Sequence, residues 1–218
     1  MHNDRRFIIT LMMVLATWVG FSSNLHAQPT GYTAVKDLAA FRERFQKESA
    51  SVQTIESSFK QDKILLALTE KITATGKFWF KRSDRVKIEY KKPFVYTMVL
   101  NGDKMLVRDG QKESQINVRS NKLFQQVNRI MIDCVQGTIL QSKDFDTRVF
   151  ENEKVYLLEL TPKARTLREF FETIVLLVDK KDYSANSIEM NEPSGDQTTI
   201  IFQDKKVNGP IDDAVFAL

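Results

Sequence analysis

Three consecutive runs decide the fold: TGKFWFKR (75–82), DRVKIEY (84–90) and PFVYTMVLNGDKMLVRDGQKESQINV (93–118). Apolar residues alternate with polar ones over much of these runs, which is the period of a β-strand with one buried face. Asn101-Gly102 and Asp109-Gly110 are dipeptides typical of tight hairpin turns, and strand-like runs flank both. The stretch therefore predicts a meander of antiparallel strands.

Strand-like runs return in the second half of the chain, separated by polar turns. Together with a strand in residues 52–66, they bring the expected total to about ten or eleven, which is typical of one large curled sheet or a barrel. Some runs alternate, whereas others are apolar on both faces and need cover on both. The later runs are DFDTRVF (144–150), KVYLLEL (154–160), ETIVLLV (172–178), ANSIEM (185–190) and TTIIFQDKKV (198–207).

Two segments have the period of amphipathic helices. Residues 34–47 follow Thr33, a suitable N-cap, and residues 121–136 end before Gly137. Two helices are few for so large a sheet, so either the concave side closes on itself or a hydrophobic cavity remains. The apolar stripes are Val35, Leu38, Phe41 and Phe45 in the first helix, and Leu123, Phe124, Val127, Ile130, Met131 and Cys134 in the second.

The first residues have the pattern of a secretory signal peptide. Arg5 and Arg6 precede an uncharged apolar stretch at 7–21, and Ala27 is a small residue at a suitable cleavage point. The stretch is short for a membrane span of about 20 residues, although an uncleaved membrane anchor remains the alternative. We expect removal of residues 1–27 and export of the mature protein to the periplasm.

The composition of the remaining chain excludes several kinds of chemistry. Hydrophobic residues make up 42% and charged residues 28% of the sequence, with few glycines and prolines, so we interpret residues 28–218 as one globular domain. Both histidines, His2 and His26, lie in the expected signal peptide, and Cys134 is the single cysteine. This excludes His-based nucleophile systems and Cys-only metal sites, and we expect neither an enzyme nor a cofactor nor a metal.

The net charge of the mature chain, +3, is too small to indicate a nucleic-acid-binding protein. Lysine dipeptides occur at 91–92, 180–181 and 205–206, where we expect solvated strand ends that protect the sheet edges. Weak attraction of these lysines to an anionic membrane surface is the alternative.

The residues at the centre of the chain resemble a known family. Residues 76–82, residues 86–90, Pro93 and Asn101-Gly102 look like the signature block of periplasmic outer-membrane lipoprotein carriers (LolA-like). An S-x-F-x-Q run at 57–61 precedes that block, as it does in the family. The order of a signal peptide, an N-terminal helix, the block, a middle helix and a C-terminal meander matches as well.

This resemblance implies an unclosed antiparallel β-barrel with helices as a lid or plug over a hydrophobic cavity. It also implies a monomeric carrier, without cofactor, for acylated lipoproteins or other lipids. By resemblance its partners are an inner-membrane lipoprotein-releasing transporter and an outer-membrane acceptor. The alternative is a periplasmic sensor or interaction module on the same scaffold, which binds lipid or protein as a signal.

The resemblance also assigns residues to roles. Arg82 matches the arginine that locks the lid, although Ser83 stands where the family usually has proline; the alternative is an exposed arginine at a strand end. A cavity lining and a filled core look identical in sequence, so ordinary core packing is the alternative for the lining positions. We expect the lining to include Phe78, Phe80, Val86, Ile88, Tyr90, Met98 and Leu100, and the lid helix to contribute Leu123, Phe124, Val127, Ile130 and Met131.

Overall fold

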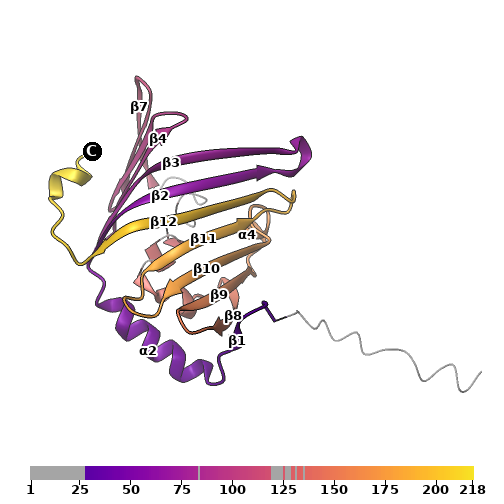
Figure 1. Ribbon diagram of the computed structural model, residues 1–218. Coiled ribbons are helices and arrows are strands. Elements are labelled where there is room, and N and C mark those ends of the chain that lie inside the picture. Colours follow the sequence, from indigo (N-terminus) through magenta and orange to yellow (C-terminus); the bar gives the residue numbers. More distant parts are fainter. Residues whose placement is uncertain (1–27, 83, 119–124, 126–128, 131, 135) are drawn as a thin grey trace, which may run out of the picture.

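A computed structural model of the protein shows one highly curved antiparallel sheet of twelve strands (Figure 1). The strands pair in the order β1-β8-β9-β10-β11-β12-β2-β3-β4-β5-β6-β7, and no pairing in the described part of the chain joins β1 to β7. The expected unclosed antiparallel barrel is therefore confirmed. The structure describes residues 28–82, 84–118, 125, 129–130, 132–134 and 136–218.

One strand more than expected is present, because two residues at 33–34 pair with β8. The β2–β3 hairpin is the longest and pairs without a break from Thr54↔Lys81 to Leu65↔Glu70. The strands are β1 (Thr33–Ala34), β2 (Thr54–Leu65), β3 (Glu70–Lys81), β4 (Arg85–Lys92), β5 (Tyr96–Asn101), β6 (Lys104–Asp109), β7 (Lys112–Asn117), β8 (Phe145–Glu151), β9 (Val155–Pro162), β10 (Thr173–Asp179), β11 (Ala185–Asn191) and β12 (Gln197–Val207).

The two predicted hairpin turns lie where expected. Gly102 joins β5 to β6 and Gly110 joins β6 to β7, and both have a φ of +59°, a backbone conformation that glycine adopts without steric cost.

The first helix begins later than predicted. Helix α2 spans Leu38–Ala50, and Asp37 rather than Thr33 is its N-cap, since the Asp37 carboxylate accepts a hydrogen bond from the backbone N–H of Ala40 at 2.9 Å. Thr33 lies in β1 instead. The described residues of the second predicted helix are helical up to Gln136, and Gly137 follows with a φ of +73°. The short helices are η1 (Leu66–Leu68), η3 (Thr138–Gln141), α4 (Arg165–Arg168) and η4 (Asp213–Phe216).

The strands β8, β9 and β10 and helix α2 form a filled core. The rings of Phe41 and Phe45 from α2 lie 5.3 Å apart and pack against Tyr156 of β9. Ile139 and Leu140 of η3 complete this cluster, and the described residues at its centre are fully buried. Figure 1 shows α2 beside this half of the sheet.

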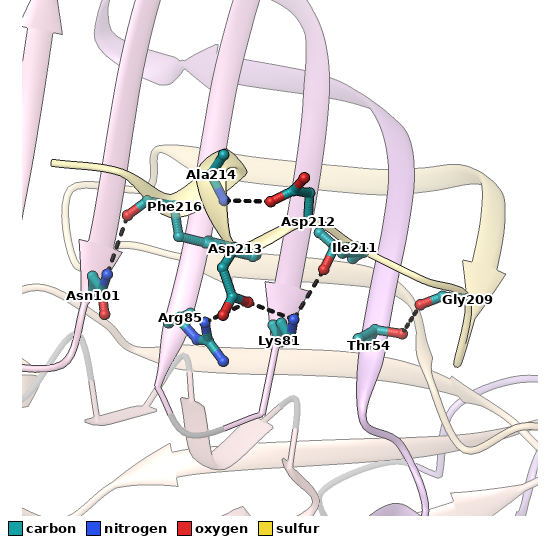
Figure 2. Close-up of polar contacts among 10 residues, drawn as sticks. All are labelled: Thr54, Lys81, Arg85, Asn101, Gly209, Ile211, Asp212, Asp213, Ala214 and Phe216. Atoms are coloured by element: carbon teal, nitrogen blue, oxygen red, sulfur yellow. Dashed lines mark hydrogen bonds and ion pairs between the residues drawn. The ribbon is translucent and has the colours of Figure 1, made fainter.

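The last residues of the chain cross the outer face of the opposite half (Figure 2). Asp213 of η4 forms ion pairs with Lys81 at 2.5 Å and with Arg85 at 2.7 Å. Phe216 is fully buried against Val99 and Leu106, which point outward from β5 and β6. The inner face of β3–β6 is therefore left for other contacts. No helix in the described part of the chain is long and apolar enough to cross a membrane.

Candidate functional site

The inner face of the sheet encloses a cavity of about 600 Å³. Strands from both halves of the fold contribute to its wall, and hydrocarbon dominates the lining. The lining residues are Ile55, Phe59, Phe78, Ile88, Tyr90, Tyr96, Met98, Leu100, Met105, Val107, Ser114, Ile116, Val118, Ile130, Cys134, Phe171, Ile174, Ala185, Ile188, Met190, Ile200 and Phe202.

Strand alternation explains the apolar wall. Successive side chains of a strand point to opposite faces, so the inward positions of β3 carry Phe78 while the outward positions carry Trp79 and Lys81. Phe202 of β12 comes within 5.3 Å of Phe78, measured between ring centroids. The two rings come from strands that are far apart in sequence but lie on either side of β2 in the sheet, and both line the cavity.

Five of the seven residues expected on the wall lie there: Phe78, Ile88, Tyr90, Met98 and Leu100. Their contact with lipid remains a prediction.

Phe80 and Val86 correct that expectation, because both are fully buried and neither lines the cavity. They form a cross-strand pair at the turn end of the β3–β4 hairpin, within a cluster that also contains Val52 and Val118. Val52 and Val118 come from outside the strands and fill the space in front of this pair. Strand alternation predicted the correct face of the sheet for both residues, but it did not predict how deeply they are buried.

The polar edge of the cavity lies at Tyr90. Its hydroxyl donates a hydrogen bond to Gln61 Oε1 at 2.8 Å, and burial raises the pKa of the phenol. The Tyr90 ring lies 5.6 Å from the ring of Phe94, which is 49% exposed, and Tyr96 packs on its other side. Apolar surface is therefore continuous from the cavity wall to solvent, a path that a long hydrocarbon chain needs.

The predicted lid helix reaches the cavity through the described residues Ile130 and Cys134. Leu123, Phe124, Val127 and Met131 of the same prediction lie outside the described residues. Burial raises the pKa of the Cys134 thiol far above its ordinary value, as expected of a cysteine that packs as a small apolar side chain.

Arg82 is not an exposed arginine at a strand end. Its Nε donates a hydrogen bond to the carbonyl oxygen of Val52 at 3.0 Å, and its Nη2 donates one to the carbonyl oxygen of Ser49 at 2.9 Å. Ser49 lies in the last turn of α2, and Val52 follows the C-cap residue Ser51. The guanidinium therefore lies at the C-terminal end of α2, which carries the negative end of the helix dipole. The structure thus places the guanidinium as a cap on α2.

The end of α2 also touches the end of the second helix. A Cβ added at Gly137 would lie 2.2 Å from the Cβ of Ser49, so only glycine permits this approach. Gln136 also donates a hydrogen bond to Asp84, in the turn after Arg82, at 3.5 Å. The β3–β4 turn therefore holds the ends of both helices.

The sequence analysis did not predict the remaining residues of the cavity wall. The positions on β6 and β7, which include Met105, Val107 and Ile116, continue the alternation beyond Met98 and could have been found by parity. The positions on β10–β12, which include Ile188 and Phe202, face the cavity only because the sheet curves back on itself.

The geometry agrees with comparisons with known proteins. A family model described as outer membrane lipoprotein carrier protein LolA matches residues 50–218. The chain belongs to the LolA family. An outer-membrane lipoprotein carrier protein from Chromohalobacter salexigens is 25% identical over 144 residues, which cover 66% of this chain and 65% of that protein.

Two solved structures are similar to this chain at low sequence identity. The Pseudomonas aeruginosa MucA/MucB complex is 12% identical with a TM-score of 0.51, over 83% of this chain and 61% of that chain. A LolA superfamily protein from Nitrosomonas europaea is 11% identical with a TM-score of 0.42, over 81% of this chain and 97% of that chain. At 12% identity, the similarity to the MucA/MucB complex concerns the fold alone.

Proposed function

We propose that the protein is a periplasmic carrier that binds the acyl chains of lipoproteins, or of other lipids, in its cavity and passes them toward the outer membrane. The observation that carries the proposal is the apolar cavity of about 600 Å³ inside a LolA-like sheet. Its volume falls within the range of about 300–1,000 Å³ typical of ligand pockets.

The lining supplies the binding free energy. Each buried methylene contributes about 0.8 kcal/mol, so ten methylenes contribute about 8 kcal/mol before the cost of immobilising the chain. About 8 kcal/mol would correspond to micromolar binding only without that cost, so a chain of ten methylenes binds more weakly than that and reversibly. Carriage of this kind requires no bond making or breaking, and the proposed mechanism assigns no catalytic residue.

Release requires a closed state that competes with cargo. The hydrogen bonds from Arg82 to the carbonyl oxygens of Ser49 and Val52 stabilise the arrangement of α2 seen here. The lid in this proposal comprises α2 and the second helix, whose ends meet at Ser49 and Gly137. We propose that the Arg82 bonds exist only when this lid is closed, so that they favour the empty carrier. By linkage, they weaken cargo binding by the same free energy and help the carrier pass its cargo on.

Residues 1–27, which lie outside the described residues, act as the signal peptide in this proposal. The mature protein then begins near Gln28 and occurs in the soluble periplasmic fraction. N-terminal sequencing of the exported protein tests this step, and a membrane-bound protein that retains Met1 contradicts it.

Native mass spectrometry of protein purified from the exporting cell tests the function. The expected result is a population with the added mass of acylated lipid or lipoprotein, which disappears on delipidation. Purified carrier loaded with a labelled acylated protein should then deliver it to acceptor membranes. A stable protein partner in place of lipid would instead support a sensor, and protein without either ligand in repeated preparations would contradict the carrier function.

A further inference from the structure

The inner face of β2 presents an amide at the edge of the cavity. Ile55 and Phe59 of β2 line the cavity, and Gln61 is the next inward position after Phe59. On the neighbouring strand β12, Gln61 pairs with Ile200, which also lines the cavity. Residues directly opposite each other on adjacent strands share a face of the sheet. The side chain of Gln61 therefore lies on the cavity side, beside two lining residues.

The aromatic wall fixes the orientation of this amide. The Tyr90 hydroxyl donates its hydrogen bond to Gln61 Oε1 at 2.8 Å, and the Tyr90 ring packs edge-on against the Phe59 ring at 5.0 Å between centroids. Gly76 pairs with Phe59 on one side and with Tyr90 on the other. A Cβ at Gly76 would lie 2.6 Å from the Phe59 ring, so only glycine lets the two rings meet.

The nitrogen of the same amide remains available. Because Gln61 Oε1 accepts from Tyr90, the amide NH₂ group provides two further N–H donors. Gln61 is partly buried, and its Nε2 donates to no atom of the residues that the structure describes. Burial raises the pKa of the Tyr90 phenol, so the hydroxyl stays protonated at neutral pH and keeps the amide in this orientation.

An acyl chain brings one polar group to this apolar site, the carbonyl that links it to its headgroup. The lining residues with a polar side-chain atom are Tyr90, Tyr96, Ser114 and Cys134. When the hydrocarbon fills the cavity and the headgroup stays in water, the carbonyl lies at the boundary between the two. Apolar surface reaches solvent from Tyr90 through Phe94, so this boundary lies at the Tyr90 edge. A carbonyl oxygen that loses water there without meeting a donor is costly.

We infer that the Gln61 amide, held in place by Tyr90, forms a subsite for the carbonyl oxygen of an acyl ester at the mouth of the cavity. This inference rests on the proposed binding of acyl chains. An N–H of Gln61 Nε2 donates to the carbonyl oxygen, and the hydrocarbon extends from there past Phe59 and Ile55. The headgroup remains outside the cavity, and the subsite thus sets how deep the acyl chain enters.

The charges at the mouth suit a neutral carbonyl better than a carboxylate. Lys63 is the next inward position of β2 after Gln61, and its ammonium pairs with Glu192 at 3.1 Å. On the other side of Tyr90, the Asp109 carboxylate adds to the effect of burial in raising the pKa of Tyr96. The cation on β2 is therefore compensated and the other charge is negative, so a free fatty-acid carboxylate gains little here.

Two lipids that differ in one group test the subsite. 1-Palmitoylglycerol carries an ester carbonyl, and 1-O-hexadecylglycerol has a methylene in its place. Displacement of dansylundecanoic acid from the full mature protein gives both affinities, and their ratio isolates the carbonyl. Gln61→Leu should lower the ratio of ester to ether affinity by about fivefold relative to the wild type, the effect of one hydrogen bond between neutral groups. Tyr90→Phe keeps the ring in the wall but releases the amide, and it should lower the ratio by a smaller factor.

Gln203→Leu is the matched control, because Gln203 is exposed and follows the inward Phe202 on β12, so that it points away from the cavity. It should keep the wild-type ratio. Circular dichroism shows whether each variant is folded, and Tyr90→Phe decides the test if Gln61→Leu fails to fold. A wild-type ratio in folded Gln61→Leu would overturn the subsite and leave acyl binding intact. Binding of neither lipid by the wild type would overturn the proposed function itself.

Discussion

The two halves of the curved sheet have the same alternating strands but different interiors. Beside β8–β10, the rings of Phe41 and Phe45 from α2 fill the concave side. Inside β2–β7, the concave side borders a cavity of about 600 Å³, to which β10, β11 and β12 also contribute lining residues. Both halves bury apolar side chains, so apolar character alone does not distinguish a filled core from a binding wall. The difference lies in whether another element delivers large side chains to the same space.

Truncation of a side chain in the filled half should have the largest effect on stability. Leu158 of β9 is fully buried within the filled core. We expect Leu158→Ala to lower the free energy of unfolding by about 2–5 kcal/mol, since the lost contacts and the new cavity add up. Urea denaturation followed by circular dichroism measures this change. A loss below about 1 kcal/mol would show that this half also contains unfilled space.

A charge on the cavity wall should affect function more than folding. Ile88 of β4 lines the cavity and is only partly buried. A carboxylate among acyl chains costs several kcal/mol, whereas water can solvate it when the cavity is empty. We expect Ile88→Asp to abolish measurable lipid binding, with an affinity lowered more than about a hundredfold. The variant should still fold, although it should be less stable. Complete unfolding of this variant would mean that Ile88 belongs to a filled core.

Loss of the contact between Arg82 and the end of α2 should affect the transfer of cargo more than the binding of cargo. Arg82→Leu removes two charge-assisted hydrogen bonds to the end of α2, each worth about 1.5–3 kcal/mol. The loss of even one shifts the ratio of closed to open states by about ten- to a hundredfold. We expect the variant to accept lipid cargo, hold it longer and deliver it slowly to acceptor membranes.

Arg85→Leu is the control for that experiment, because Arg85 pairs with Asp213 on the outer face. It should transfer cargo at the wild-type rate. Equal rates for folded wild type and Arg82→Leu would show that the cap on α2 is structural and takes no part in release.

Truncation of the cavity wall should have the smallest effect on stability. Met98 of β5 lines the cavity and is partly buried, so its side chain borders space that is already unfilled. We expect Met98→Ala to lower the free energy of unfolding by about 1 kcal/mol, because the removed atoms have fewer contacts to lose. The same urea denaturation checks this value, and a loss as large as that of Leu158→Ala would remove the contrast between the halves.

Local signals determined most of the architecture. The period-two runs and the turns at Gly102 and Gly110 specify strands and hairpins through backbone geometry, and the structure confirms them. The sequence predicted the helix boundaries less accurately. Asp37 and Thr33 are both suitable N-caps, and only tertiary contacts place Thr33 in β1. The resemblance to the LolA family in the central block is likewise confirmed by the family match.

How deeply a side chain is buried, and which distant residues it contacts, could be known only from the tertiary structure. Alternation places Phe78 and Phe80 on one face, but only the packing of Val52 and Val118 decides that Phe80 is core while Phe78 lines the cavity. Sequence fixes the face of a side chain because that follows from the local backbone, whereas what fills the space in front of it depends on residues far away in the chain.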